Sequence, residues 1–106
     1  IPGAVGAWEA LNKAHGRKGL DELLQPAIRF AEEGFHLSAR VANDWGSSVG
    51  KLSNHAAARR RFLKDGQAFG LGDKFVQPEL AATLRAIAKG GAKAFYEGAI
   101  AADMVA

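Results

Sequence analysis

An amphipathic stretch from Leu20 to Phe35, with the sequence LDELLQPAIRFAEEGF, constrains the fold more than any other part of this chain. Its apolar residues recur at the i, i+3, i+4, i+7 spacing that places side chains on one face of a helix. Those residues are Leu20, Leu23, Leu24, Ala27, Ile28 and Ala31. Such a face needs an apolar partner, so the pattern predicts a helix that packs against other helices.

The ends of this central helix and a break inside it are also visible in the sequence. Asp21 and Glu22 lie in the first turn, where negative charge meets the positive end of the helix dipole. Gly34 lies where a left-handed C-terminal cap is needed. Pro26 has no N–H for an intrahelical hydrogen bond, so a kink near Leu24 or two short helices in line is expected.

Similar helical patterns recur along the rest of the chain. The predicted segments are Val5–Ala14, Ser38–Trp45, Asn54–Leu63, Pro78–Lys89, Ala92–Tyr96 and Ala99–Ala106. Ser38 is a suitable N-cap, Asn54 or His55 is expected to cap the segment that runs to Leu63, and Pro78 suits the first position of a helix. Gly90 and Gly91 are expected to end the helix that Pro78 begins. Gly6 is unfavourable within a helix, which suggests that another backbone passes close to it.

The apolar stripes of the outer helices predict which side chains face the core. They comprise Val5, Trp8 and Leu11 in the first helix and Leu80, Leu84, Ile87 and Ala88 in the helix that Pro78 begins, with Phe95 and Tyr96 packing inward beyond it. Between Lys64 and Val76 the helical spacing is lost, and Asp65-Gly66 forms a typical turn pair. A small irregular hairpin or ordered loop is expected there.

A chain of 106 residues, of which 48% are hydrophobic, is long enough for one small core. The prediction is therefore a single helical domain over residues 1–106, all-α, with about five to six helices. The sequence opens at Ile1 without a start signal, and Met104–Ala106 ends inside an apolar helical run. These two features suggest a piece excised from a longer protein.

Composition excludes several classes of site. The chain has no cysteine, so it contains no disulfide, thiolate nucleophile or cysteine-based metal site. No apolar run approaches the length of a membrane span, and the beginning of the chain does not resemble a signal peptide. The formal charge of +3 is mild, and both signs are interspersed, so the charge balance does not indicate a nucleic-acid partner.

The polar residues do not form a catalytic or metal-binding pattern. His15, His36 and His55 are about twenty residues apart and have no metal-ligand spacing, so they are interpreted as surface histidines. Glu32 and Glu33 are neighbours on a helix, where they point in different directions and cannot share a proton. No catalytic, substrate-binding, cofactor-binding or metal-binding residue is therefore assigned, and no cofactor is predicted.

Hydroxyl, cationic and aromatic side chains were also considered as sites. Ser47, Ser48 and Thr83 have no base nearby in the sequence and are not interpreted as nucleophiles. The run Arg59-Arg60-Arg61 with Lys64 could contact phosphate, but the polar face of a short helix explains it more simply. The larger aromatic residues are interpreted as core rather than as a ligand cage. They are Trp8, Trp45, Phe30, Phe62, Phe75 and Phe95.

Four blocks of sequence, taken in order, resemble the large subunit of gamma-glutamyltranspeptidases across essentially the whole chain. The blocks are IPGAVGAWEALNKAHGR, LDELLQPAIRFAEEGF, FLKDGQ and GDKFVQPELAATLRAIAKGGAKAFYEGAIA. The most specific parts are Pro2-Gly3 to Gly6, Leu24 to Phe35, and Gln77-Pro78 to Leu84 followed by Phe95-Tyr96-Glu97-Gly98. Each block is weak alone, but four in the same order make a specific resemblance.

The resemblance implies a segment of a larger αββα N-terminal-nucleophile hydrolase whose precursor cuts itself. The threonine at the new N-terminus of the small subunit would take the gamma-glutamyl group from glutathione or a related amide and pass it to water or an amino acid. That threonine region would lie far downstream of this segment. The arginine that holds the substrate carboxylate would lie just upstream. Thr83 does not match the nucleophile, and no catalytic residue is carried over.

The role left for this segment is that of a scaffold that packs against the remainder of the large subunit and the small subunit. The isolated segment should be inactive and is expected to expose an apolar patch, which makes self-association plausible. An independent helical binding module, a nucleic-acid binder that uses Arg59–Lys64, and a related acylase such as a cephalosporin acylase stay open. The compartment is not set by this segment, although the family is typically periplasmic, secreted or membrane-anchored.

Overall fold

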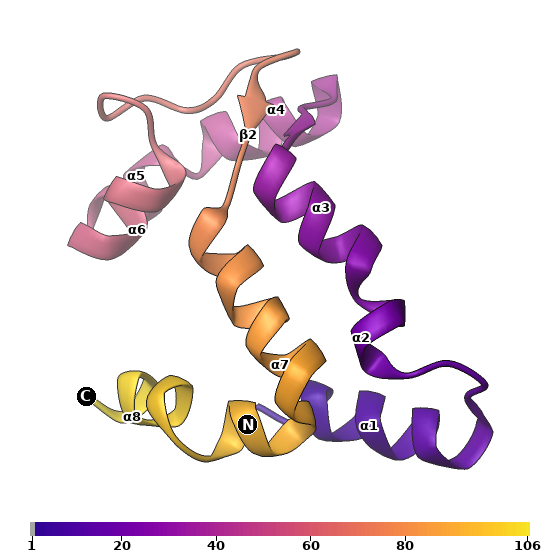
Figure 1. Cartoon of the computed structure of the whole chain (residues 1–106). Helices are drawn as coiled ribbons and strands as arrows, with labels where there is room; N and C mark the ends of the chain where they lie inside the picture. Colours follow the sequence, from indigo (N-terminus) through magenta and orange to yellow (C-terminus); the bar gives the residue numbers. More distant parts are fainter. Residues whose placement is uncertain (1) are drawn as a thin grey trace. The chain divides into compact units, whose positions relative to one another are not determined.

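The computed structural model describes residues 2–106, which form eight helices and one pair of short antiparallel strands (Figure 1). These residues fall into two compact units. The first unit comprises the described residues up to Glu33 together with Gln77–Ala106, and the second comprises Gly34–Val76. The mainly helical class predicted from the sequence is confirmed. The expectation of a single helical domain stays a prediction.

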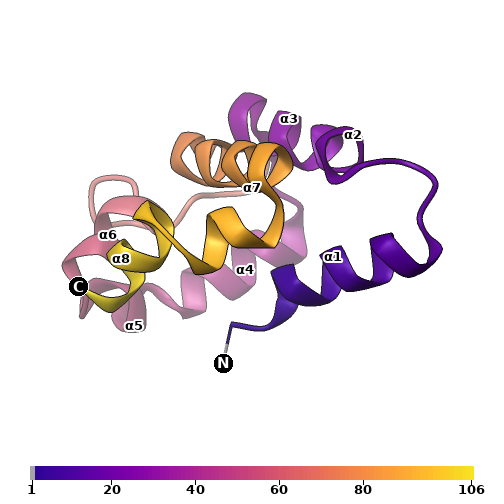
Figure 2. The ribbon, with the colours of Figure 1, turned by 60° about the horizontal axis from the view of Figure 1, so that its bottom comes forward.

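The first unit is built on two neighbouring antiparallel segments. Helices α2 (Leu20–Leu23) and α3 (Gln25–Glu33) lie beside α7 (Pro78–Tyr96) in both views of the ribbon (Figures 1 and 2). Helices α1 (Ala4–His15) and α8 (Ala99–Val105) contact α7 as well. The core between α3 and α7 consists of Ile28, Ala31, Ala81 and Leu84, with Leu24 and Ala88 packed against it. Alanine at two core positions allows the two backbones to approach closely.

The break predicted in the central helix is confirmed. Helix α2 ends at Leu23, Leu24 lies between the two helices, and α3 begins one residue before Pro26. Gly34 follows α3 with φ of 80°, which is the left-handed conformation expected of its cap. This division and the short helices of the second unit explain why the structure has more helices than the sequence predicts.

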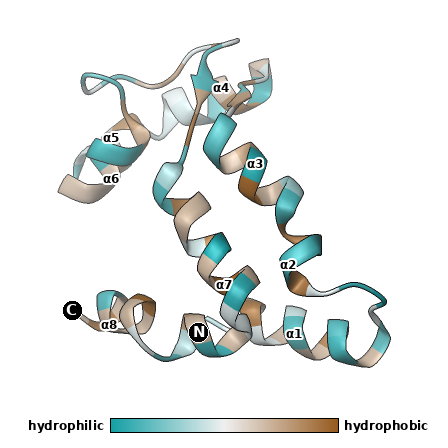
Figure 3. Ribbon diagram, viewed as in Figure 1, coloured by the Kyte–Doolittle hydropathy of each residue, from teal (hydrophilic) through white to brown (hydrophobic). Residues whose placement is uncertain are grey.

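The buried face of α2 and α3 is narrower than the sequence predicts. Ile28 and Ala31 are buried, but Leu23 is 48% exposed and Ala27 is also exposed. The predicted face combined two adjacent stripes of the helix, and only one of them contacts α7. The other stripe, which contains Leu23 and Ala27, faces solvent, as does Phe30 beside it. Hydrophobic and hydrophilic residues accordingly alternate along α3 (Figure 3).

Helix α7 begins with Pro78 at its first turn, as predicted, and buries Ala81, Leu84 and Ile87. Leu80 was expected in the buried stripe but is 42% exposed, because the contact follows the 81, 84, 87 row instead. Regular geometry is interrupted at Gly91, which has φ of 64° and ψ of −159°. The predicted glycine break is thus confirmed, and a last helical stretch continues to Tyr96 beyond it.

The second unit contains three short helices: α4 (Ala39–Ser47), α5 (Val49–Ser53) and α6 (Ala56–Phe62). The predicted N-cap of α4 is confirmed, since the Ser38 hydroxyl accepts a hydrogen bond from the N–H of Val41 over 3.4 Å. His55 precedes α6 but makes no side-chain cap. Helix α5 lies where glycine and serine weaken the helical pattern.

The two strands pair across the sequence. The expected turn at Asp65-Gly66 is present and is closed by a bridge between Lys64 and Gln67. Strand β2 (Lys74–Phe75), however, pairs with β1 (Phe35–His36) rather than within 64–76. Local spacing could not reveal this pairing, because its two strands are separated by three helices.

Aromatic rings pack around the buried Phe75 in the second unit, whose other buried residues are Leu37 and Leu63. Trp45 lies against Phe62, Phe69 and Phe75, with ring centroids 6.2, 5.5 and 4.7 Å away. The Trp45 indole N–H donates to the Phe62 carbonyl over 2.7 Å, so its polar atom is satisfied inside the cluster. The core prediction is confirmed for Phe75, which is 5% exposed, and Trp45 and Phe62 are half-buried beside it. Phe69 was not predicted as core but joins the cluster. The core prediction is wrong for two residues of the first unit, Trp8 and Phe30, which are 42% and 57% exposed.

No helix in residues 2–106 combines the length and apolar character that crossing a membrane requires.

Candidate functional site

The three histidines belong to different parts of the chain and do not form a site. His15 ends α1, His36 lies in β1, and His55 precedes α6, and all three are exposed. His36 is held by its Nδ1 atom, 2.9 Å from the carbonyl oxygen of Gly72. Across the residues that the structure describes, no group of three His, Cys, Asp or Glu side chains could hold a metal ion.

The hydroxyl groups considered as nucleophiles are occupied by local hydrogen bonds. Ser47 and Ser48 donate to the carbonyl oxygens of Asn43 and Asp44, one turn earlier in α4. Thr83 donates in the same way to the carbonyl oxygen of Glu79 over 3.0 Å. These contacts are typical of serine and threonine within helices and do not activate a hydroxyl.

The two adjacent carboxylates of α3 have different surroundings and do not form a pair. Glu32 forms an ion pair with Arg85 of α7, whereas Glu33 is exposed. Both members of the Glu32–Arg85 pair are about half exposed, so its contribution to stability is modest. Its role is to align α3 with α7 at the surface, above the apolar core of the first unit.

The best-defined polar contacts join α1 to the end of α7. The Glu9 carboxylate accepts a hydrogen bond from the backbone N–H of Ala92 over 3.0 Å, and the Gly6 N–H donates to the Tyr96 hydroxyl over 3.1 Å. We name these two contacts the α1–α7 clasp. Gly6 was expected to lie near another backbone, but its close neighbour is the Tyr96 side chain, 3.5 Å from where a Cβ would lie.

The clasp depends on the unusual backbone of Gly91. At this residue φ is positive, and a Cβ atom would lie 2.4 Å from a Glu9 carboxylate oxygen. Hydrogen bonds from Ala92 and from the Lys13 ammonium, together with the positive charge of Lys13, lower the pKa of Glu9. The carboxylate is therefore held ionised, and it satisfies an N–H that follows a break in the helix.

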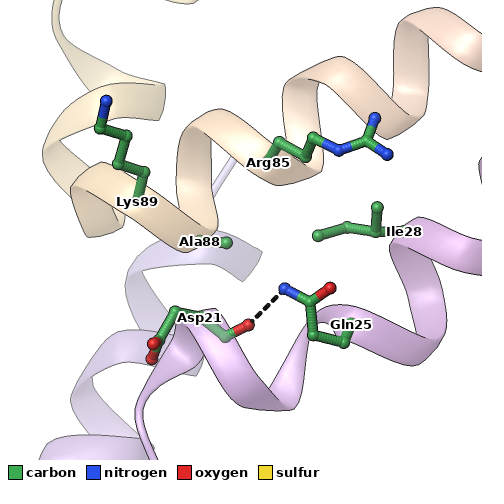
Figure 4. Close-up of a pocket in the computed structure, with 6 residues that line it drawn as sticks. All are labelled: Asp21, Gln25, Ile28, Arg85, Ala88 and Lys89. Carbon is green, nitrogen blue, oxygen red and sulfur yellow. Dashed lines mark hydrogen bonds between the residues drawn. The ribbon is translucent and has the colours of Figure 1, made fainter.

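A charged hollow of about 570 Å³ lies between α2–α3 and α7 (Figure 4). Its lining comprises Asp21, Gln25, Ile28, Arg85, Ala88 and Lys89. The Gln25 amide donates to the backbone carbonyl of Asp21 over 2.8 Å. The Lys89 side chain points away from Gln25, and the Arg85 guanidinium extends toward Ile28 rather than toward Asp21 (Figure 4). The polar groups thus do not converge on one ligand.

The second unit contains an apolar hollow of about 350 Å³. Its lining residues come from α4, α5, α6 and the residue between α4 and α5. They are Val41, Asp44, Trp45, Ser48, Leu52 and Phe62. The Asp44 carboxylate forms an ion pair with Arg40 over 2.8 Å, so the charge in this lining is already paired.

Sequence reasoning missed both the clasp and the apolar hollow. The Glu9–Lys13 spacing of four residues was a visible signal for an ion pair along α1, which the structure contains. Nothing in local spacing connects Glu9 with Ala92. The sequence predicts a helix over Ser38–Trp45, but local spacing does not reveal the hollow that Val41, Trp45 and Leu52 leave beside Phe62.

Comparisons with known proteins identify the wider context of these elements. The model of the family described as gamma-glutamyltranspeptidase matches residues 1–106. The chain is 37% identical to the glutathione hydrolase-like YwrD proenzyme of Bacillus subtilis strain 168 over 105 residues, which is 99% of the chain and 20% of that protein. The chain spans about a fifth of the length of the curated relatives it matches.

Parts of solved protein structures match the fold of this chain. The structure of Helicobacter pylori gamma-glutamyltranspeptidase matches with a TM-score of 0.95 and 36% identity, over 98% of this chain and 30% of that one. The structure of a cephalosporin acylase from Bacillus halodurans matches with a TM-score of 0.90 and 32% identity, over 98% of this chain and 20% of that one. The sequence comparison and the structural comparison therefore both match this chain to the same family over nearly its whole length.

Proposed function

The chain belongs to the gamma-glutamyltranspeptidase family, and from this premise we propose that it is a helical scaffold segment of an enzyme that transfers or hydrolyses gamma-glutamyl groups. The observation that supports this most strongly is the family match over residues 1–106. The complete enzyme would take the gamma-glutamyl group of glutathione or a related amide and pass it to water or to an amino acid. The segment would contribute shape and stability rather than reacting groups.

The contacts within the first unit support a scaffold role. Ile28 and Ala31 of α3 pack against Ala81 and Leu84 of α7, and these aliphatic side chains offer no reactive group. The α1–α7 clasp then fixes a third helix to the same frame through Glu9 and Tyr96. A frame of this kind can hold neighbouring parts of an enzyme in place, which is how a segment without reacting groups contributes to catalysis.

Stripes of exposed apolar side chains support packing against the remainder of the enzyme. Trp8 and Leu11 on α1 are 42% and 63% exposed, and Phe30 on α3 is 57% exposed. Exposed apolar area of this kind is characteristic of surfaces that other parts of a protein cover. The remainder of the large subunit and the small subunit would be the partners. The isolated segment would then be inactive and inclined to associate with itself.

In the complete enzyme, self-cleavage of a proenzyme would produce a small subunit with threonine at its N-terminus. Several relatives are described as proenzymes, which supports such processing. The amine of that threonine would act as the base for its own hydroxyl, which would attack the gamma-glutamyl carbonyl. The amide C–N bond would then break, and the leaving amine would take up the proton, so that the gamma-glutamyl group stays on the threonine as an ester. Water or an amino acid would then release the gamma-glutamyl group from the enzyme.

A second candidate is an enzyme of the same architecture that hydrolyses a different amide. The structural match to a cephalosporin acylase, at 32% identity, specifically favours this alternative. The reaction class would be the same, since both involve acyl transfer from an amide. Only the acyl group would differ, and the side chains that select it would lie outside this segment.

Expression of the complete protein that contains this chain tests the proposal. Mass spectrometry should find two polypeptides, the smaller beginning with threonine, and the purified enzyme should release p-nitroaniline from gamma-glutamyl-p-nitroanilide. Hydrolysis of a cephalosporin side-chain amide without gamma-glutamyl activity would favour the second candidate. A single uncut and inactive chain would contradict both. The 106-residue chain alone serves as the control and should be inactive on either substrate.

A further inference from the structure

We propose that the apolar hollow of the second unit is a docking site for an acidic polypeptide segment that inserts one apolar side chain. This inference does not depend on the proposed catalytic function. It rests on two observations within residues 34–76: a mainly apolar hollow, and a set of five exposed cations that take part in none of the ion pairs found among the described residues.

The lining of the hollow favours an apolar guest. Val41, Leu52 and the rings of Trp45 and Phe62 supply apolar surface in a volume of about 350 Å³, enough for one or two large side chains. The few polar atoms have partners within the unit. The indole N–H of Trp45 donates to the Phe62 carbonyl, and the Ser48 hydroxyl donates to the Asp44 carbonyl over 2.8 Å. A polar guest would therefore gain few hydrogen bonds in return for the hydration that it loses.

The charge of the second unit favours an acidic partner. Residues 34–76 contain seven Lys and Arg but only three Asp and Glu, a formal charge of +4, whereas the remainder of the chain carries −1. Two of the three acids are held locally, because Asp44 pairs with Arg40 and an oxygen of Asp73 accepts from the Gly70 N–H. The charge available to a partner is therefore positive.

Exposed cations of this unit include two that adjoin the hollow in sequence. Arg40 is exposed but pairs with Asp44. None of the ion pairs found among residues 2–106 involves the other five exposed cations, Lys51, Arg59, Arg60, Lys64 and Lys74. Lys51 directly precedes Leu52 of the lining, and Arg59 lies one turn before Phe62 on α6. Lys51 also follows Ser48 of the lining by three residues, and residues three apart share a helix face. Both cations are therefore expected to border the hollow, where they would attract an acidic segment.

The aromatic geometry favours a polypeptide over a nucleic acid. Proteins that bind single strands stack bases on exposed aromatic faces. Here Trp45 is half-buried and packs against Phe62, Phe69 and Phe75 with centroids within 6.2 Å, so the hollow does not present a row of exposed ring faces on which successive bases could stack. The hollow instead resembles the pockets that take an anchoring side chain from a bound peptide.

Trp45 also provides a direct readout. In a Trp8→Phe background it is the only tryptophan of the chain, and Trp8 lies in the first unit. The probe is a twelve-residue peptide, blocked at both ends, that carries one central Phe among Glu and Ser. Titration into the full 106-residue chain should shift or quench the Trp45 emission and reach saturation. Affinity should fall about tenfold or more when the central Phe is replaced by Ala.

Two pairs of variants separate the parts of the proposed site. Arg59→Glu should weaken binding at least threefold and reduce its dependence on salt, whereas Arg17→Glu, the same change on an exposed residue of the first unit, should not. Val41→Gln should weaken binding by placing a polar group at the hollow, whereas Leu71→Gln should not, because Leu71 is 70% exposed and does not line it. Circular dichroism checks that each variant keeps its helix content.

The controls also define what would overturn the proposal. It fails if the Phe and Ala peptides bind equally, if the same peptide with Lys in place of Glu binds as well, or if no peptide changes the Trp45 emission at millimolar concentration. Tighter binding of a duplex DNA of 20 base pairs, with loss in Arg59→Glu but not in Val41→Gln, would indicate a nucleic-acid surface instead.

Discussion

The two units are packed with different kinds of side chain. In the first, aliphatic side chains meet along two neighbouring helical segments, and two of the four buried cluster residues are alanines, Ala31 and Ala81. In the second, rings from α4, α6, the following loop and β2 gather around Trp45 and Phe75.

This difference determines how each unit should respond to substitution. Contacts in the first unit are spread along α3 and α7, and surface pairs such as Glu32–Arg85 and the α1–α7 clasp add to them. In the second unit, Phe75 alone contacts four other aromatic rings, so much of the packing passes through one side chain. The first unit should therefore tolerate the loss of one contact better than the second.

The largest expected effect is that of Phe75→Ala. Phe75 is 5% exposed, and truncation of a buried phenylalanine typically costs about 3–5 kcal/mol. Hydrogen exchange should lose its protection in α4 and α6 while α3 and α7 retain theirs. Phe30→Ala, the same change at a side chain that is 57% exposed, is the control and should have little effect. Equal loss of protection in both units would show that they unfold together and would remove the contrast.

The second prediction concerns close packing in the first unit. Ala81 is completely buried between α3 and α7, so Ala81→Leu should force the helices apart and cost about 1–3 kcal/mol of unfolding free energy. Ala82→Leu, at an exposed neighbouring position of the same helix, should change it by less than about 0.5 kcal/mol. Urea denaturation measures both. Matching values for the two variants would mean that α3 and α7 are not tightly packed at Ala81.

A third prediction compares two glycines, one from each unit. Gly91→Ala should destabilise the chain by about 1–3 kcal/mol, because its φ and ψ values are strained for other residues and a Cβ would meet Glu9. Gly46→Ala should instead stabilise it by about 0.5–1 kcal/mol, because Gly46 lies within α4 and a Cβ there meets nothing within 4 Å. Thermal melts distinguish the two signs. Destabilisation by Gly46→Ala would indicate a close neighbour at that position.

The sequence predicted where helices begin, break and end better than it predicted which face of each helix is buried. The break near Leu24, the Ser38 cap and the glycine interruption at Gly91 follow from chemistry within a few residues, and the structure confirms all three. Which stripe of a helix becomes buried depends on where the partner helix lies. Leu23 and Leu80 therefore satisfied the helical pattern but are exposed.

Contacts between distant parts of the sequence could not be predicted either, because they too depend on how the helices are arranged. The β1–β2 pairing and the Glu9–Ala92 hydrogen bond join residues far apart in the sequence, and periodicity contains no information about such pairs. The aromatic residues were predicted as one class of core side chains. Their division between a packed cluster and exposed positions such as Trp8 depends on the arrangement of helices in each unit.

The smallest expected effect tests the clasp, which has no counterpart among the aromatic contacts of the second unit. The Ala92 N–H and Lys13 lower the pKa of Glu9 in the folded chain, so its ionised form is bound more favourably there than in the unfolded chain. The resulting stability should be fully present above the ordinary glutamate value of 4.5 and should be lost as the pH falls through the lowered value. Glu9→Gln keeps the size of the side chain but removes its charge. Urea midpoints measured between pH 7 and pH 3 should therefore fall less steeply in Glu9→Gln than in the parent chain. Glu33→Gln, the same change at an exposed glutamate of α3, is the matched control. Identical acid limbs in the parent and in Glu9→Gln would show that the clasp does not depend on an ionised carboxylate, and the contact of α1 with α7 would then rest on the Gly6–Tyr96 hydrogen bond and on apolar packing.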